Sequence, residues 1–274
     1  MPSFSFRRDT EPGPLITLLT DYGTDGIYVG VLHALIGRIC ANARVLDVTH
    51  AVAPGDVTAG ALALLDALPY LPQAIHVAVV DPDVGTERRA VALLCENGHT
   101  LIGPDNGVLM LAANAAGGVK SAYDISASQW RLSPVSPTFH GRDVFVPVAA
   151  SLAAGNLLSE AGTPFDPGAL VSLELPNPEV EDRRLTATVT AVDRFGNLAL
   201  LAMPADAERA GLEPGGAVMV GTHAARFGKT FADVGVGRLL LHVDSTGRLA
   251  LAVNQGNAAE RLGVGAGDRL TINN

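Results

Sequence analysis

Short apolar runs and helical patterns alternate along the first 165 residues of the chain. The strand-like runs are apolar along their length and end in a polar turn, as strands buried on both faces do. The helix-like stretches repeat apolar residues every three or four positions. The predicted strands cover 15–21, 43–50, 74–81, 90–96 and 99–105, and the predicted helices cover 26–39, 56–71, 106–115 and 143–155. This alternation predicts an α/β sheet with helices on both faces.

The pattern changes after residues 166–182, which hold three prolines and show no clear periodicity. Beyond them, "RLTATVTAVD" alternates like a strand, and "GRLLLHVDSTGRLALAVN" indicates two β runs around a tight turn. We therefore predict an N-terminal α/β domain with a central, largely parallel sheet over 15–165, a linker over 166–182, and a smaller, mostly β domain over 183–274. The proline-rich start predicts a flexible tail over 1–14.

Composition and charge narrow the class of protein. The chain has 274 residues, 48% of them hydrophobic, which is enough for a sizeable core. A net charge of −9 argues against nucleic acid or an anionic membrane as a partner, because both need a basic surface. Cys40 and Cys95 form no Cys-x-x-Cys pair and suit small core residues. With no apolar leader and no long uncharged span, we expect a soluble, cytoplasmic protein.

Three acidic residues, Asp21, Asp81 and Asp105, each end or directly follow a predicted strand. Ligands of open α/β sheets bind outside the carboxyl ends of strands, so these acids are candidates for one shared crevice. Aspartate also favours turns and helix N-caps, and that structural role fits each position equally.

Other motifs leave functional and structural interpretations open. "DPDVG" over 81–85 is similar to the Asp-x-Asp motif of metal-dependent phosphatases, but glycine stands where that motif has Thr or Val. His140 lies on a short loop before an apolar helix, which suits a preorganised polar group. The turn with Asp193, Phe195 and Asn197 suits either a planar or zwitterionic ligand or a tight hairpin. The histidines lack metal-ligand spacing, and no P-loop, nucleophile elbow or dinucleotide fingerprint follows a strand.

Seven motifs in order form a more specific pattern, and they run from about Leu15 to Ile272: "LLTDYGTDGIYVG", "LDVTHAVAPGDV", "VDPDVGTERRAV", "GPDNGVL", "TFHGRDVFVPVAA", "DRFGNL" and "LAVNQGNAAERLG". Taken together they resemble the adenosine-forming S-adenosyl-L-methionine (SAM) hydrolases, also called SAM hydroxide adenosyltransferases. These enzymes are relatives of the fluorinases and chlorinases.

The resemblance implies an N-terminal α/β domain, a C-terminal β-barrel-like domain and a homotrimer with ligand sites between subunits. It also implies the reaction, in which water attacks ribose C5′ of SAM and expels L-methionine, leaving adenosine. No cofactor and no metal are implied, since SAM is the substrate.

The resemblance assigns roles to individual residues. The catalytic set falls on Asp81, Arg88 and His140, and the ribose-binding aspartate falls on Asp21. The ligand contacts it implies in the C-terminal domain are Asp193 and Asn197, Ser245 at the methionine end, and the backbone around Val253 and Asn254 at the adenine edge. Phe195 joins them as a candidate through its own chemistry, an aromatic ring beside an amide on the same turn.

These residue types suit the chemistry. A sulfonium leaves as a neutral thioether, so the difficulty is to present one water in line with C5′. Asp81 is expected to orient that water or accept its proton, Arg88 to fix the carboxylate, and His140 to hold the water from the other side. Asp21 has two acceptor oxygens for the two ribose hydroxyls.

Alternatives stay open at this point. A halide-using SAM transferase would form 5′-halo-5′-deoxyadenosine, although His140 and the Asp81–Arg88 pair favour hydroxide. Thr246 stands where the halogenases carry Arg, which leaves the methionine end less defined. A magnesium-dependent phosphohydrolase built on Asp81 and Asp83 would depend on metal, and a non-catalytic adenosine- or SAM-binding module would show no turnover.

Overall fold

The structure is a computed structural model of the chain, and it describes residues 13–274. The chain divides into two units, with the boundary between Leu173 and Glu174. This boundary lies within the predicted linker, in which Pro167–Ala169 forms a 3₁₀ turn and β8 (Glu179–Glu181) pairs with the strand that follows. Of the predicted tail over 1–14, residues 1–12 lie outside the described part of the chain.

The first unit is built on one seven-stranded sheet with the order β2-β1-β3-β5-β4-β6-β7. Neighbours from β2 to β5 pair in parallel, and β4, β6 and β7 add antiparallel pairs. The strands are β1 (Leu15–Thr20), β2 (Arg44–Thr49), β3 (Ile75–Val79), β4 (Ala90–Cys95), β5 (Thr100–Pro104), β6 (Val119–Asp124) and β7 (Thr163–Phe165). β6 and β7 were not expected from the sequence pattern.

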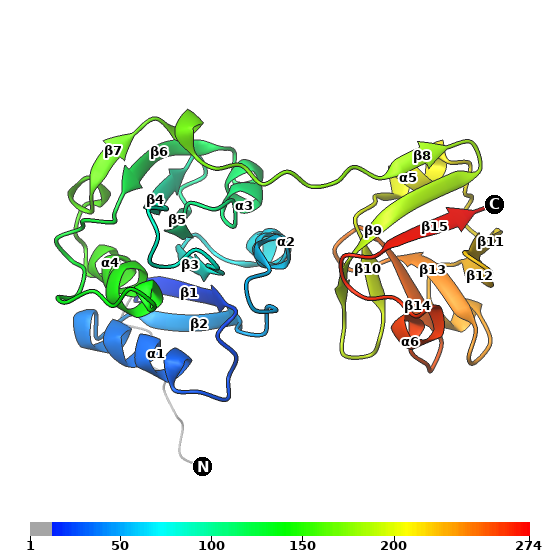
Figure 1. The fold of residues 1–274 in the computed structure, drawn as a ribbon, viewed down its shortest axis with the longest axis horizontal. Helices are drawn as coiled ribbons and strands as arrows, with labels where there is room; N and C mark the ends of the chain where they lie inside the picture. The colour runs from blue at the N-terminus through cyan, green and yellow to red at the C-terminus, as the bar shows by residue number, and fades with distance from the viewer. Residues whose placement is uncertain (1–12) are drawn as a thin grey trace, which may run out of the picture. The chain divides into compact units, whose positions relative to one another are not determined.

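Helices cover both faces of this sheet, as Figure 1 shows. α1 (Tyr28–Ile39) and α4 (Val146–Ala153) pack on one face, and α2 (Val57–Ala67) and α3 (Met110–Ala115) on the other. Successive residues of a strand point to opposite faces, so the largely buried run of β1 supplies apolar side chains to both cores. The α/β prediction is therefore confirmed.

The starts and ends of these helices follow local chemistry. The Asp56 side chain accepts a hydrogen bond of 2.9 Å from the backbone N–H of Ala59, which caps the start of α2. α2 passes into a 3₁₀ turn, Leu68–Tyr70, at the proline that cannot continue an α-helix. A π-helical turn over Gly141–Phe145 precedes α4.

The second unit is a closed barrel of seven strands, because β10 pairs with both β9 and β14 and so joins the two ends of the sheet. Its strands are β9 (Arg184–Val192), β10 (Leu198–Leu200), β11 (Ala217–Val220), β12 (His223–Phe227), β13 (Leu239–Val243), β14 (Leu249–Val253) and β15 (Arg269–Asn273). α5 (Pro204–Arg209) and α6 (Ala258–Leu262) lie outside the barrel strands. The predicted β-barrel-like domain is confirmed.

The barrel core comes from alternating strand residues such as Leu185, Leu200, Leu251 and Ile272, all fully buried. Full closure leaves no long exposed sheet edge. Among residues 13–274, no helix is long and apolar enough to cross a membrane.

Candidate active site

The loop after β3 joins Asp81 to Arg88. Nε of Arg88 donates to both carboxylate oxygens of Asp81, at 2.9 and 3.0 Å, and Nη2 also donates to Oδ2. Both side chains are nearly buried, with exposed fractions of 5% for Asp81 and 9% for Arg88. The guanidinium carbon lies 5.4 Å from the centre of the Phe145 ring. The turn between Asp81 and Arg88 therefore folds back and brings the two side chains, seven residues apart, into one charge-assisted pair.

His140 completes this pair from a separate loop. Its Nδ1 lies 2.9 Å from Nη2 of Arg88. A guanidinium only donates, so Nδ1 must accept, and the neutral imidazole then carries its proton on Nε2. Burial and the positive charge of Arg88 lower the pKa of His140, against the opposing effects of Asp81 and Asp143. The structure thus holds His140 neutral, with an N–H donor on Nε2.

Two glycines let these loops approach each other. Gly85 has a left-handed φ of +84°, and a Cβ at this position would clash with the carbonyl oxygen of Pro137. Gly141 lies directly against the hydroxyl of Tyr22, which a Cβ would also overlap. A larger residue at Gly85 would separate the Asp81–Arg88 turn from the loop that carries His140, and one at Gly141 would push that loop away from Tyr22.

Tyr22 is a half-buried neighbour of this cluster that the sequence analysis did not identify. Its ring packs edge-on against Phe139, with centroids 5.6 Å apart. Burial raises the pKa of Tyr22, and the negative charges of Asp21 and Asp81 raise it further. Both carboxylates therefore act on one phenol, which places Asp21 in the same neighbourhood as Asp81. An aromatic residue directly after a strand-end aspartate was the available sequence signal.

Asp21 and Asp105, the other two acids at strand ends, differ in their surroundings. Oδ2 of Asp21 accepts a hydrogen bond of 2.8 Å from the backbone N–H of Gly55, and within residues 13–274 Oδ1 accepts none. Asp105 is instead saturated by Nε of Arg89 at 2.8 Å and the backbone N–H of Val171 at 2.9 Å. Asp21 keeps an acceptor for a ligand, whereas Asp105 has a structural role.

The phosphatase-like interpretation loses its basis in this geometry. The Asp81 carboxylate is occupied by Arg88, while Asp83 is exposed and its backbone carbonyl accepts hydrogen bonds from Thr86 within the turn. A guanidinium on the first aspartate takes the position that a cation would need. Arg142 pairs with the buried Asp143 at 2.6 Å beside this loop.

In the barrel unit, the turn between β9 and β10 is ordered by Asp193. Its Oδ1 accepts from the backbone N–H groups of Phe195 and Asn197 at 2.8 and 2.9 Å, and its Oδ2 accepts from the Asn197 amide at 2.8 Å. The carbonyl oxygen of Gly196 in turn accepts from the first N–H groups of α6. Asp193 therefore shapes the turn and holds the Asn197 amide, whereas Phe195 is exposed on a fixed backbone.

Two cavities share this turn. One, of about 230 Å³, is lined by Asp193, Asn197 and Ser245, and the other, of about 430 Å³, is lined by Asn197, Phe195 and Val253. The Asn254 side chain instead donates to the carbonyl oxygen of Val234 at 2.8 Å. The structure thus gathers five of the six predicted barrel residues around adjoining cavities.

Phe231 also lines the larger of these two cavities and was missed in the sequence. The Phe195 side chain is 69% exposed and that of Phe231 is 46% exposed, which is unusual for phenylalanine. Two exposed rings on one cavity suit a flat ligand. No periodic pattern surrounds Phe231, so its position depends on the long-range path of the barrel.

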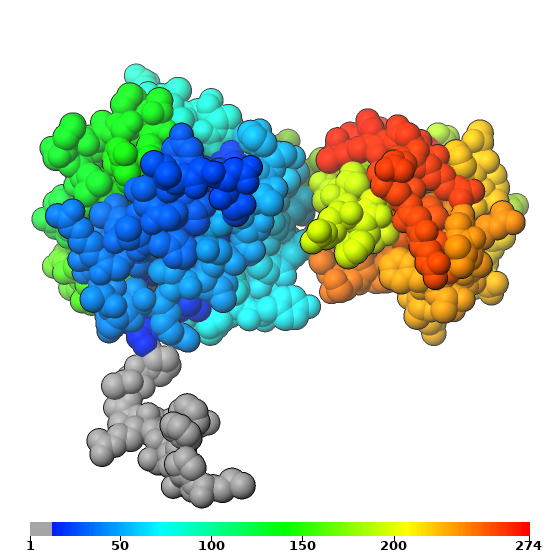
Figure 2. All heavy atoms as spheres, turned by 90° about the horizontal axis from the view of Figure 1, so that it is seen from below, coloured from blue at the N-terminus to red at the C-terminus, as the bar shows by residue number. Residues whose placement is uncertain are grey.

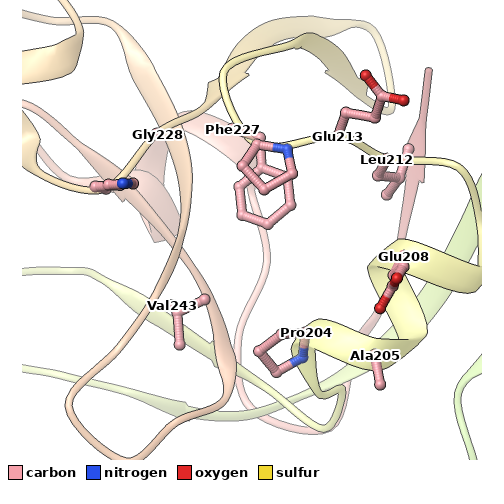
Figure 3. A pocket seen from close by; sticks show the side chains of 10 residues that line it. Pro204, Ala205, Glu208, Leu212, Glu213, Phe227, Gly228 and Val243 are labelled. Carbon is pink, nitrogen blue, oxygen red and sulfur yellow. The ribbon is translucent and has the colours of Figure 1, made fainter.

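A larger cavity of about 660 Å³ lies elsewhere on the barrel (Figure 3). Its walls include Pro204, Leu212, Phe227 and Val243, and none of the predicted ligand residues lines it. The predicted ligand residues thus line two smaller cavities rather than this one.

Family models match both units of the chain. The model described as the SAM hydroxide adenosyltransferase N-terminal domain matches residues 16–162, and the corresponding C-terminal domain model matches residues 187–271. The chain belongs to the SAM hydroxide adenosyltransferase family. The resemblance indicated by the ordered motifs is confirmed.

Individual relatives place the chain within this family. It is 48% identical to the (R)-S-adenosyl-L-methionine hydrolase of Salinispora tropica, over 95% of this chain and 98% of that protein. It is 28% identical to a fluorinase of an Actinoplanes species, over 94% of this chain and 97% of that protein. The fold matches the crystal structure of an uncharacterized conserved protein from Thermotoga maritima with a TM-score of 0.87 and 35% identity, covering 94% and 100% of the two chains.

Proposed function

We propose that this chain hydrolyses SAM to adenosine and L-methionine by in-line attack of water on ribose C5′. The observation that carries the proposal is that one guanidinium, that of Arg88, contacts both the Asp81 carboxylate and the His140 imidazole. Relatives named SAM hydrolases are more similar to the chain than those named fluorinases, which favours water over halide as nucleophile.

The protonation pattern of the site supports two contacts for the proposed water. Asp81 is an acceptor, so a water O–H donates to it. His140 carries its proton on Nε2, so it donates to the water oxygen. The remaining lone pair of the oxygen is then free to approach C5′. Arg88 fixes both partners, which removes motions that would misplace the water.

The bond changes balance without a cofactor. The water oxygen forms the new C5′–O bond, and the C5′–S bond breaks with its electron pair passing to sulfur. The sulfonium thereby becomes the neutral thioether of methionine. The oxygen loses one proton to the Asp81 carboxylate, which returns it to solvent.

The ligand contacts divide between the units. Asp21, with Oδ1 open, is proposed to bind the ribose hydroxyls beside the water. Phe195 and Asn197 are proposed to hold the adenosine part of SAM, with Val253 and Asn254 at the adenine edge. Ser245 and Asp193, on the smaller barrel cavity, are proposed to hold the methionine end.

We further propose a homotrimer in which the N-terminal unit of one subunit and the barrel unit of another complete each site. The support is that the water-holding residues and the outward-facing aromatic residues belong to different units. Co-expression of a His140→Ala chain with an Asn197→Ala chain tests this: shared sites restore activity in mixed oligomers. Two inactive variants that stay inactive together, with a monomer mass in light scattering, would contradict it.

Product analysis tests the activity itself. The chain is incubated with SAM and EDTA, with and without chloride, and the products are separated by chromatography. We expect equal amounts of adenosine and methionine and no 5′-chloro-5′-deoxyadenosine. Asp81→Asn and His140→Ala should each lower kcat by roughly 10²-fold. Asp83→Asn, which changes an exposed carboxylate of the same turn, should retain the wild-type rate. Unchanged SAM at high enzyme concentration would refute the proposal.

A further inference from the structure

A row of polar side chains in contact with one another, separate from the Asp81–Arg88–His140 cluster, leads to the turn that carries Asp21. It runs from Thr20 at the end of β1 through His50 and Asp47 to His33 on α1. α1 and β2 contribute to the blue surface of the first unit in Figure 2. Thr20 is fully buried and the His50 side chain is 4% exposed, whereas Asp47 and His33 are each 38% exposed. This row of side chains, called the relay below, thus connects the protein surface to the turn after β1.

The direction of each hydrogen bond can be assigned. Asp47 accepts from Nε2 of His33 at 2.8 Å. Nε2 of His50 lies 3.1 Å from Oδ1 of Asp47, at ion-pair distance, and within residues 13–274 it makes no hydrogen bond. Burial alone would raise the pKa of Asp47, but the neighbouring His33 and His50 outweigh it and lower the pKa. The His50 tautomer with its proton on Nε2, the nitrogen that faces Asp47, accepts on Nδ1, and the Thr20 hydroxyl then donates to it at 2.8 Å.

The oxygen of Thr20 then accepts the backbone N–H of Tyr22 at 3.2 Å, which closes the turn around Asp21. The His50 segment holds this turn at two more points. The Gly23 N–H donates to the carbonyl oxygen of His50 at 2.8 Å, and the Gly55 N–H donates to Oδ2 of Asp21 at 2.8 Å. Three separate ties therefore fix the backbone and side chain of Asp21.

Thr20 and His50 are too deeply buried to touch a ligand, so they can act only through the residues they hold. We propose that Thr20, His50 and Asp47 are positioning residues that keep the Asp21 carboxylate aligned with the ribose hydroxyls of SAM. This inference rests on the proposed function. Each polar group of the relay restricts the orientation of the next through its contact with it, so the groups together hold the turn around Asp21 in one geometry.

A double-mutant cycle with Asp21 tests the inference. Thr20→Val keeps the shape of the side chain and removes its hydroxyl. We expect the KM for SAM to rise roughly tenfold while kcat changes less than threefold, and Thr20→Ser to restore the KM. In an Asp21→Asn background, Thr20→Val should add less than a twofold change, because the group it positions is already altered.

The chain offers a matched control three residues earlier. Thr17 is also a buried β1 threonine, and its Oγ1 lies 2.8 Å from Nδ1 of a buried histidine, His76. Thr17→Val therefore removes the same kind of contact, and the KM should stay within twofold of wild type. If Thr20→Val does not fold, Asp47→Asn, at the half-exposed end of the relay, takes its place in the cycle.

The outcomes separate this inference from the proposed function. Absence of SAM turnover in the wild-type chain would refute the function. Normal turnover with equal KM effects in the Asp21 and Asp21→Asn backgrounds would refute the positioning role alone. Equal KM effects of Thr17→Val and Thr20→Val would do the same, since the effect would then be one of general packing.

Discussion

Gly85→Ala perturbs the geometry of the water-holding cluster without changing any of its polar groups. The residue has φ of +84°, and a methyl group there would overlap the carbonyl oxygen of Pro137 in the loop that leads to His140. An alanine in left-handed conformation costs roughly 1–2 kcal/mol. To restore an ordinary carbon–oxygen contact of about 3.3 Å, the two loops must also separate by roughly 1 Å.

The same separation acts on the site. It would stretch the 2.9 Å contact between Arg88 and His140 beyond hydrogen-bond distance. Misplacement of about 1 Å lowers catalysis by about 10²-fold, or roughly 2.7 kcal/mol in the barrier. We therefore expect kcat to fall about 10²-fold while the unit stays folded, as measured by steady-state SAM turnover and by the fluorescence of Trp130, the single tryptophan of the chain.

Gly155→Ala is the matched control, because Gly155 has φ of +98° and a Cβ there would meet nothing within 4 Å. Gly155→Ala should lower the unfolding free energy measured in urea by the cost of the left-handed alanine, and it should keep the wild-type kcat. If Gly85→Ala also kept the wild-type kcat, the close approach of the two loops would have no catalytic role, and the reasoning would be wrong.

Four further predictions concern separate parts of the molecule. Asp105→Asn should lower the unfolding free energy by about 1–3 kcal/mol with kcat unchanged, measured by urea unfolding and turnover, since Asp105 ties Arg89 and Val171. Burial, and then the neighbouring His99, lower the pKa of His76 to about 4 in the folded protein. The unfolded chain therefore takes up the proton at higher pH, and the unfolding free energy should fall by about 2 kcal/mol from about pH 7 to about pH 5. Urea unfolding followed by Trp130 fluorescence measures this fall, and His76→Gln should abolish the part of it that comes from His76. Phe231→Ala should raise the KM roughly tenfold with kcat retained, if the ring stacks on the ligand. Because the pKa of His140 is lowered, the acid limb of the kcat profile should lie below pH 6.5, and a limb above that value would contradict the neutral imidazole.

Much of the fold could be predicted because its signals are local. The apolar run of β1, the helical spacing of α1 and the hairpin of β13 and β14 are each contained in one stretch of sequence. β6 was missed because "VKSAYD" is short and only one of its residues is buried. The closure of the barrel was implied only by the family resemblance, since the pairing of β10 with β14 joins residues about fifty positions apart, as Leu198 and Leu251 do.

The candidate site likewise has residues that local motifs predicted and residues that depend on distant parts of the sequence. The sequence offered Asp81, Arg88 and His140 as candidates through their motifs, and the structure brings their side chains into contact; their catalytic roles stay a prediction. Asp105 looked equivalent to Asp81 in sequence, but it binds Arg89, and its hydrogen bond from Val171 comes from a loop sixty-six residues away. Tyr22 and Phe231 were missed because their significance comes from which residues the fold places beside them.

A single turnover in ¹⁸O-labelled water tests most directly whether solvent itself attacks C5′. Enzyme is mixed in excess over SAM in H₂¹⁸O, and the adenosine formed in that one turnover is analysed by mass spectrometry. Water held by Asp81 and His140 puts ¹⁸O into the 5′ position of nearly all the adenosine. Unlabelled adenosine from the first turnover would show that a carboxylate oxygen of the protein attacks the sugar, and would contradict the account.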